Sequence, residues 1–154
     1  MSFGRHVVLW SAMRSGSTEF AKDLARACNW SYADEALNPK LSKFNPRVLH
    51  AASPTILKFF DGHYKAAGVR SQCALALERS PTERWCSLLH ARRTARWSGR
   101  RQQGCGSTRP PPKFVQRHNA WIRQLPARAL FLTFENVTKH RVAAIRAACM
   151  HCSG

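Results

Sequence analysis

Short apolar runs alternate with helix-compatible stretches along this 154-residue chain. The runs predict four strands, over residues 6–10, 55–60, 73–77 and 128–134. Apolar side chains at helical spacing, with a Ser80-Pro81 start signal, predict helices over 18–28, from 80 towards 97, over 113–125 and over 139–150. Strands that alternate with helices favour a parallel sheet covered on both faces, and the wholly apolar run 73–77 indicates an interior strand.

Two stretches show neither the apolar runs typical of strands nor the apolar spacing typical of helices. Residues 30–46 contain turn formers and carboxylates and predict a loop, whereas residues 98–112 are rich in Gly, Arg and Pro and predict a mobile surface loop. Asp61-Gly62 predicts a turn after the second strand.

The length suits a single domain, residues 1–154, with a real core, because 44% of the residues are hydrophobic. No apolar run is long enough to cross a bilayer, and no signal-peptide pattern opens the chain. We therefore expect a soluble protein, cytoplasmic by default, or from the Golgi lumen if the chain is a fragment of a membrane-anchored protein.

The charge is strongly unbalanced. Twenty-five lysines and arginines oppose eight acidic residues, a formal net charge of +17. This excess favours a polyanionic partner, which can be a nucleic acid, an acidic glycan or a phosphate-rich cofactor. An arginine-rich solvated surface explains the same charge, so charge alone does not decide between these interpretations.

The six cysteines are scattered along the chain. Cys28, Cys73 and Cys86 are interpreted as small core residues because their neighbours are apolar. Cys149 and Cys152 have the spacing of a redox or metal pair, but no second pair accompanies them, so we expect no metal site there. The redox compartment stays open.

The first apolar run leads into the segment MRSGST at residues 13–18 and then into helix-forming sequence. A strand, a tight loop and a helix start, in this order, direct backbone N–H groups at one point near the positive end of the helix dipole and form an anion site. Gly16 permits close approach to a phosphate and Arg14 supplies a fork-shaped cation. Hydroxyl donors are added by Ser15, Ser17 and Thr18. The glycine–lysine–hydroxyl signature of common phosphate-loop nucleotide hydrolases is absent.

Ligands of parallel α/β sheets bind beyond the carboxyl ends of the strands. This rule brings three segments to one rim of the predicted sheet: the loop 14–18, the residues after Phe60, and Glu78-Arg79-Ser80. We expect the chemistry of the protein at this rim.

Four segments, in chain order, resemble sulfotransferases. RSGST at 14–18 resembles the 5′-phosphosulfate loop of carbohydrate and bacterial members, and LERSPTERWCS at 77–87 resembles their 3′-phosphate segment. DEALNP at 34–39 is similar to a Gly-Glu-Pro segment, and FENV at 134–137 is similar to a late Tyr/Phe-Glu-Asp-Leu strand end. The resemblance implies a three-layer α/β/α fold with a parallel sheet, like that of P-loop nucleotide hydrolases.

The resemblance also implies a reaction. A sulfuryl group would move from 3′-phosphoadenosine 5′-phosphosulfate (PAPS) to a hydroxyl of a carbohydrate or another small hydroxylated molecule, without a metal. By the family pattern, Arg14 and the loop residues Ser15–Thr18 hold the 5′-phosphosulfate, while Arg79 and Ser87 bind the 3′-phosphate. Two separate anionic groups on one donor need two separate cationic sites, which agrees with this division.

An acceptor hydroxyl needs a general base within hydrogen-bond reach. The Gly-Glu-Pro resemblance makes Glu35 the first candidate, with a surface carboxylate as the alternative interpretation. His63 is the second candidate, although Lys58 and His63 lie further apart than in the family's Lys-x-His pattern. Lys58 either assists the leaving group or extends from the strand end to solvent.

Two residues depart from the family pattern. Glu19 puts a carboxylate beside the anion site, where it would repel the donor if it pointed inward, and Ala36 replaces a proline.

Two other function classes compete with the sulfotransferase. The first is a phosphate-loop nucleotide kinase. The missing lysine and the lack of an obvious magnesium carboxylate on a strand count against it. A nucleic-acid-binding module would use a group of arginines that fits no familiar recognition motif: Arg92, Arg93, Arg96, Arg100 and Arg101. We expect no nucleic-acid partner and no membrane segment.

Overall fold

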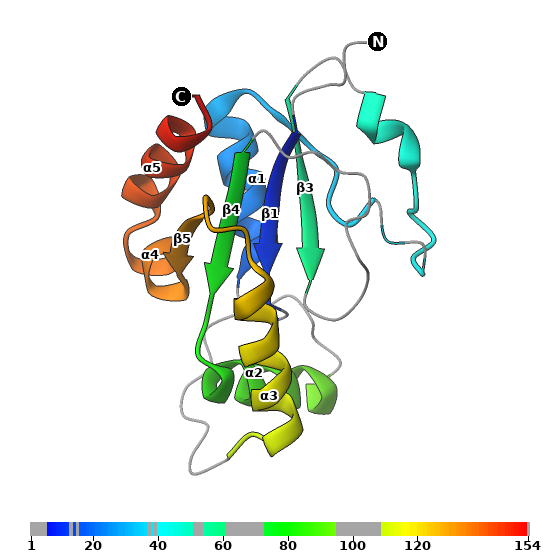
Figure 1. Ribbon diagram of the computed structural model, residues 1–154, viewed down its shortest axis with the longest axis vertical. Helices are drawn as coiled ribbons and strands as arrows, with labels where there is room; N and C mark the ends of the chain where they lie inside the picture. Colours follow the sequence, from blue (N-terminus) through cyan, green and yellow to red (C-terminus); the bar gives the residue numbers. More distant parts are fainter. Residues whose placement is uncertain are drawn as a thin grey trace.

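The computed structural model describes residues 6–12, 14, 16–36, 38, 40–50, 54–60, 73–94 and 109–153. Within these ranges the strands are β1 (His6–Ser11), β2 (Ser31–Tyr32), β3 (Thr55–Phe60), β4 (Cys73–Glu78) and β5 (Leu130–Thr133). They form one sheet in the order β2-β3-β1-β4-β5, and every neighbouring pair is parallel (Figure 1). The predicted parallel α/β architecture is confirmed, with β4 as an interior strand.

The described helices are α1 (Ser17–Cys28), α2 (Pro81–Thr94), α3 (Pro112–Gln124), α4 (Phe134–Lys139) and α5 (Arg141–Ser153), with a 3-10 helix, η1 (Pro46–His50). The start of α2 is as predicted, because the Ser80 hydroxyl accepts a hydrogen bond from the Glu83 backbone N–H at 3.2 Å. The predicted extension of α2 towards residue 97, the turn at 61–62 and most of the loop 98–112 lie outside the described residues.

Helices α1 and α5 cover one face of the sheet (Figure 1). Residues that alternate along β1 divide between the two faces: Val7 and Leu9 pack in the cluster that contains the buried residues of α1 and α5, while Val8 packs on the opposite side. On that opposite face the sheet contacts partly buried residues of η1, and Leu125 at the end of α3. In the described part of the chain, helical cover of this second face comes from η1 and the C-terminal end of α3.

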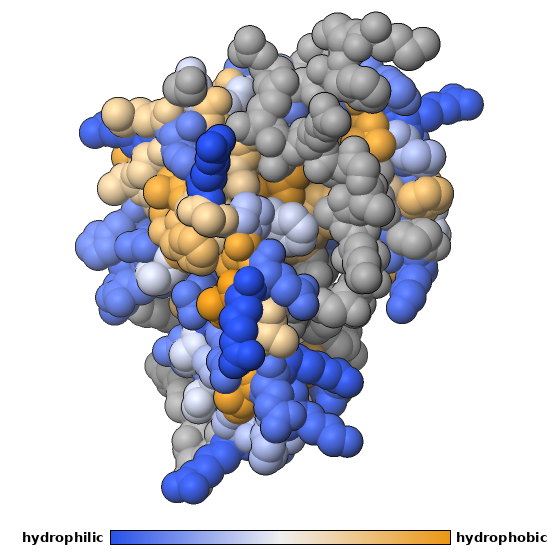
Figure 2. Space-filling view, viewed as in Figure 1, coloured by the Kyte–Doolittle hydropathy of each residue, from blue (hydrophilic) through white to orange (hydrophobic). Residues whose placement is uncertain are grey.

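Helices α2 and α3 lie beyond the carboxyl ends of the strands, where the arrowheads of β1, β3 and β4 point (Figure 1). They contact each other through Trp85 and Phe114, whose ring centroids are 5.2 Å apart. Hydrophilic side chains predominate at this end of the molecule in the same view (Figure 2). The rim of the sheet is thus bordered by a polar helical pair.

Two predicted boundaries near the carboxyl end of the chain are wrong. The strand predicted over 128–134 covers only Leu130–Thr133, and Phe134 begins α4, so the FENV segment is helical and not a strand end. The cause is local: the Thr133 hydroxyl accepts from the Asn136 backbone N–H at 3.1 Å, and the Asn136 side chain accepts from the Thr133 N–H at 2.8 Å.

The loop predicted over 30–46 also contains β2, which is too short for a periodic signal.

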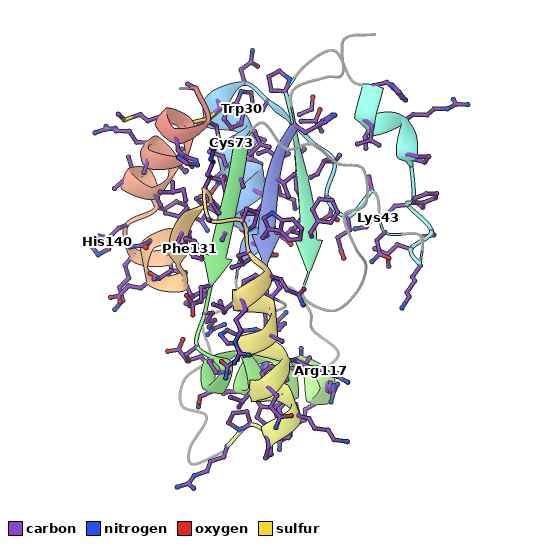
Figure 3. All side chains as sticks on the ribbon, in the orientation of Figure 1. Trp30, Lys43, Cys73, Arg117, Phe131 and His140 are labelled. Atoms are coloured by element: carbon purple, nitrogen blue, oxygen red, sulfur yellow. A yellow bond between two sulfur atoms is a disulfide. The ribbon has the colours of Figure 1, made fainter. Side chains whose placement is uncertain are left out.

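Cys73 and Cys86 are buried in the core, as predicted, and the structure adds disulfide bonds that the sequence left open. Cys28 is bonded to Cys149 and Cys73 to Cys152, and Cys86 is also in a disulfide. Cys149 and Cys152 therefore do not pair with each other, and no cysteine in the described part of the chain is a free thiol. Cys73, at the start of β4, lies at the same end of the sheet as Trp30 and the end of α5 (Figure 3). The two bonds join α5 to α1 and to β4.

In the ranges that the structure describes, no helix combines the length and the apolar composition that a membrane span requires.

Candidate functional site

The carboxyl ends of the three central strands are level. Ser11 at the end of β1 is in register with Phe60 of β3 and with Leu77 of β4. The loop that follows β1 and the Glu78-Arg79-Ser80 segment therefore leave the sheet side by side, as the rim rule predicts. The third predicted segment of the rim, after Phe60, lies outside the described residues.

Gly16 shapes the loop between β1 and α1. It caps α1 with φ +79°, a left-handed conformation that glycine adopts without strain. A Cβ at this position would also lie 3.1 Å from Cε2 of Phe134, so the ring of α4 packs directly against the loop backbone. Arg14 is left-handed as well, with φ 66°. These two residues turn the chain into the first turn of α1.

Arg14 joins the loop to α2. Its Nε donates to the Ser87 hydroxyl oxygen at 3.0 Å, across 73 residues of sequence. Burial lowers the pKa of Arg14, although a guanidinium still keeps its proton at neutral pH. The two residues assigned by resemblance to opposite ends of the donor therefore touch.

Arg79 lies against the same loop. It donates from one terminal guanidinium nitrogen to the Arg14 carbonyl oxygen at 3.0 Å, and the guanidinium carbon is 3.8 Å from the centroid of the Phe134 ring. Its Nε contacts the Glu83 carboxylate at 3.4 Å. Burial lowers the pKa of Arg79, as do the charges of Arg14 and Arg84, while Glu83 opposes the shift. Three arginine charges thus converge at this rim.

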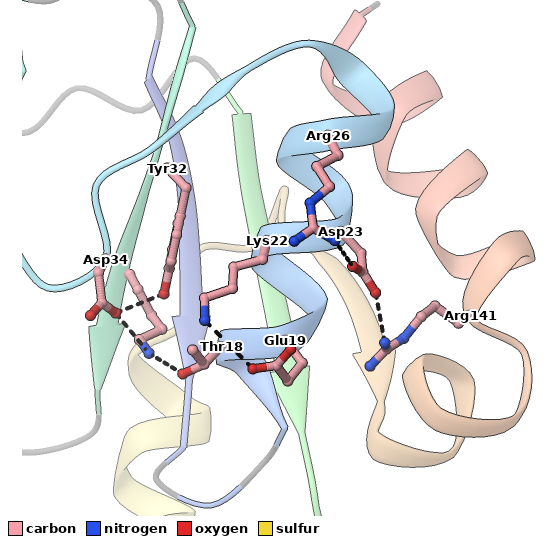
Figure 4. Close-up of polar contacts among 9 residues, drawn as sticks. Thr18, Glu19, Lys22, Asp23, Arg26, Tyr32, Asp34 and Arg141 are labelled. Atoms are coloured by element: carbon pink, nitrogen blue, oxygen red, sulfur yellow. Dashed lines mark hydrogen bonds and ion pairs between the residues drawn. The ribbon is translucent and has the colours of Figure 1, made fainter. Parts of the chain in front are cut away.

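Lys58 does not extend to solvent, so that interpretation of its side chain is wrong. The side chain is 3% exposed, and its ammonium donates to the Thr18 hydroxyl oxygen at 2.7 Å and forms an ion pair with Asp34 at 2.9 Å. Tyr32 donates to Asp34 at 2.7 Å (Figure 4). Lys43 contacts the second carboxylate oxygen. A buried charge needs this kind of opposite partner, because desolvation is costly.

The ionisation of this cluster follows from the same contacts. Although burial acts to raise it, hydrogen bonds from Lys43, Tyr32 and Lys58 lower the pKa of Asp34 to about 2. Burial and the hydrogen bond to Asp34 raise the pKa of Tyr32. At neutral pH Asp34 is therefore a carboxylate and Tyr32 is a protonated donor.

The remaining predicted site residues are arranged as follows. Ser17 is buried and Thr18 is half-buried in the first turn of α1, while Ser15 and His63 lie outside the described residues. Glu35 is half-buried directly after Asp34, and the Asn38 side-chain amide approaches its carboxylate at 3.5 Å. Ala36, which replaces the expected proline, is buried.

Glu19 points away from the anion site. Its side chain is 66% exposed and contacts Lys22 at 3.6 Å on the outer side of α1 (Figure 4). The carboxylate therefore does not point into the 14–18 loop.

Sequence reasoning missed a buried arginine behind the rim. Arg84 of α2 is 2% exposed and donates to Nδ1 of His118 at 2.7 Å. Because arginine has no acceptor, His118 must accept through Nδ1 and carry its proton on Nε2, which lies 3.7 Å from Glu78. This contact holds α3 against α2 and adds a positive charge behind Arg79.

Asp34 and Tyr32 were also missed, because the strand that brings them to the rim is only two residues long.

No group of three His, Cys, Asp or Glu side chains with metal-binding geometry is found among the described residues.

No family model and no curated protein matches this sequence. Among solved structures, the chain is similar to a gluconokinase from Sinorhizobium meliloti 1021, with 14% identity and a TM-score of 0.53 over 99% of this chain and 94% of that one. A sugar kinase from Janibacter sp. HTCC2649 aligns with 16% identity and a TM-score of 0.48 over 96% of this chain and 98% of that one. The likeness to the gluconokinase extends over the whole fold and agrees with a P-loop nucleotide-hydrolase-like architecture.

Proposed function

We propose that this chain is a nucleotide-dependent transferase that uses PAPS as the donor and moves a sulfuryl group to a hydroxyl acceptor. One observation carries the proposal: Arg79 donates to the carbonyl of Arg14, and Arg14 donates to Ser87. The two anion-binding segments that the resemblance identifies therefore form one connected group at the carboxyl rim. A donor with an anionic group at each end is the kind of ligand that such a group fits.

The roles of the residues follow from their chemistry. Arg14 and the first-turn N–H groups of α1 bind the 5′-phosphosulfate, and Arg79 binds the 3′-phosphate. Ser87 accepts from Arg14 in the structure, and its own O–H group is a donor for the 3′-phosphate. Phe134 stacks on Arg79 and keeps the guanidinium plane in place.

In the transfer, the acceptor oxygen bonds to sulfur and the bond from sulfur to the bridging oxygen breaks. The electron pair stays on the 5′-phosphate of the product 3′-phosphoadenosine 5′-phosphate (PAP), where Arg14 and Lys58 stabilise the charge. The acceptor proton passes to a general base.

Glu35 is our first candidate for that base and His63 the second. Glu35→Gln keeps the shape of the side chain and removes its basicity, so PAP binding should persist while sulfuryl transfer from PAPS to a panel of hydroxylated acceptors is lost. Retained turnover would instead assign the role to His63, which His63→Gln tests in the same assay.

A phosphate-loop kinase is the second candidate, and the structural comparison supports it better than it supports a sulfotransferase, because the aligned protein is a gluconokinase. In that case the donor would be a nucleoside triphosphate with a magnesium ion and the acceptor a sugar hydroxyl. The residues argue otherwise, since Ser17 stands after Gly16 where the phosphate-loop signature has lysine.

Thermal unfolding with ligands separates the two candidates. PAP should raise the melting temperature of the wild-type protein, and ATP with magnesium should not. Arg79→Ala should abolish the PAP shift, whereas Arg141→Ala, which removes an arginine paired with Asp23 on α1, should retain it. A larger shift with ATP and magnesium than with PAP would replace the sulfotransferase by the kinase.

The disulfides bear on the compartment. Bonds such as Cys28–Cys149 and Cys73–Cys152 persist in oxidising compartments and are rare in the cytosol. We therefore favour an oxidising compartment, such as the Golgi lumen, over the cytoplasm. Peptide mapping of the native protein under non-reducing conditions tests this choice, and free thiols at these four positions would contradict it.

A further inference from the structure

The contacts that hold the Lys58 ammonium come from outside its own strand. It lies on β3, yet its ammonium contacts Thr18 in the first turn of α1 and Asp34 after β2. Because the Lys58 side chain is only 3% exposed, the direction of its ammonium depends on these polar neighbours.

Asp34 has the geometry to set that direction. The same carboxylate oxygen that pairs with Lys58 accepts from the Tyr32 hydroxyl, and the other oxygen pairs with Lys43. Asp34 also has a left-handed backbone, φ 50°, which Asp and Asn tolerate better than most residues. The carboxylate is thus fixed from its own backbone and from three side chains.

We propose that Asp34 is a positioning residue: it holds the Lys58 ammonium against Thr18, where the ammonium faces the 5′ end of a bound PAPS molecule. This inference rests on the proposed function. Asp34 itself is fully engaged with cations and a hydroxyl donor, so it acts through Lys58 and not on the reacting atoms.

Two effects of removing the carboxylate oppose each other. The negative charge of Asp34 repels an anion nearby, so its loss alone would strengthen binding. Two lysines already pair with that charge, however, and release of Lys58 from Thr18 removes a cation from the ligand. Loss of position therefore dominates.

The test compares the binding of PAP with that of adenosine 3′-phosphate, which lacks the 5′-phosphate, by calorimetry. Asp34→Asn preserves the left-handed backbone and should weaken PAP binding about tenfold, the loss typical of one charged hydrogen bond. Binding of adenosine 3′-phosphate should stay within about twofold, because its phosphate is held by Arg79 and Ser87. A change that merely disturbed the fold would weaken both ligands.

Lys58→Met and the double variant Asp34→Asn/Lys58→Met, together with Asp34→Asn and the wild type, form a double-mutant cycle. If Asp34 acts through Lys58, the double variant should bind PAP no more weakly than Lys58→Met alone. Asp23→Asn is the matched control, because Asp23 has the same 27% side-chain exposure as Asp34 and pairs with Arg141 away from the loop. It should bind both ligands like the wild type.

Several results would overturn the inference: tighter PAP binding by Asp34→Asn, equal losses for both ligands, or additive losses in the double variant. If the wild type binds PAP and only the Asp34 cycle fails, the proposed function stands without this role for Asp34. If the wild type does not bind PAP, the proposed function fails, and the inference fails with it.

Discussion

At the scale of single residues, Phe134 and Gly16 shape the proposed anion site. The Phe134 ring packs against Gly16 and against the Arg79 guanidinium. Any side chain at position 16 would press on this ring and strain the left-handed backbone. Gly16 therefore serves the position of Arg79 and, in the proposed function, also the approach of a phosphate.

Asp34 gives a residue-scale prediction about acid stability. Its pKa is lowered from 3.8 to about 2 by folding, so the carboxylate stabilises the native state above about pH 4, and this contribution is lost as the pH falls from 4 to 2. The loss should amount to about 2 kcal/mol.

Urea unfolding at pH 5, 4, 3 and 2 measures this effect. The free energy of unfolding of Asp34→Asn should fall less steeply over this range than that of the wild type. Parallel curves for Asp34→Asn and the wild type would contradict the ionised Asp34 cluster.

At the scale of elements, α5 depends on bonds that lie outside it. Few of its residues are buried, Ala144 and Ala148 among them, and exposed Val142 and Met150 lie on the same helix. The helix therefore lacks a wide apolar stripe, and its two disulfides to α1 and β4 compensate.

Removing one of these bonds should destabilise the protein. Cys28→Ser/Cys149→Ser should lower the free energy of unfolding by about 2–4 kcal/mol, because a closed loop of this length strongly restricts the unfolded chain. Met150→Ser, on the exposed side of α5, should change it by less than about 0.5 kcal/mol. Urea denaturation without reductant measures both, and an unchanged double variant would show that α5 does not need this bond.

At the scale of the whole molecule, one fold is compatible with two kinds of donor. The parallel sheet and the gluconokinase likeness establish the architecture, but at 14% identity the likeness shows the fold alone and not a reaction. The difference lies in a few side chains at the rim, where Arg14 and Arg79 stand and a signature lysine does not. The net charge of +17 favours an anionic ligand in either case.

The local parts of this fold are predictable from sequence because their determinants lie within a few residues of one another. The Ser80 cap bonds to Glu83, three residues away, and the strand, Gly16 and α1 succeed each other directly. Thr133 and Asn136 carry a signal of the same kind, but the apolar run before them predicted a longer strand. Element type was predictable, whereas the ends of elements depended on single hydrogen bonds.

The amino-acid sequence by itself determined the alternation of strands and helices, the small-residue loop and the rim at which Arg14 and Arg79 would lie. Only the tertiary structure decided that Arg14 reaches Ser87, that Lys58 reaches Thr18 across 40 residues, and that Cys149 and Cys152 bond to α1 and β4. The reason is physical: periodicity and caps act over three or four residues, whereas the partner of a buried charge or thiol depends on which elements pack together.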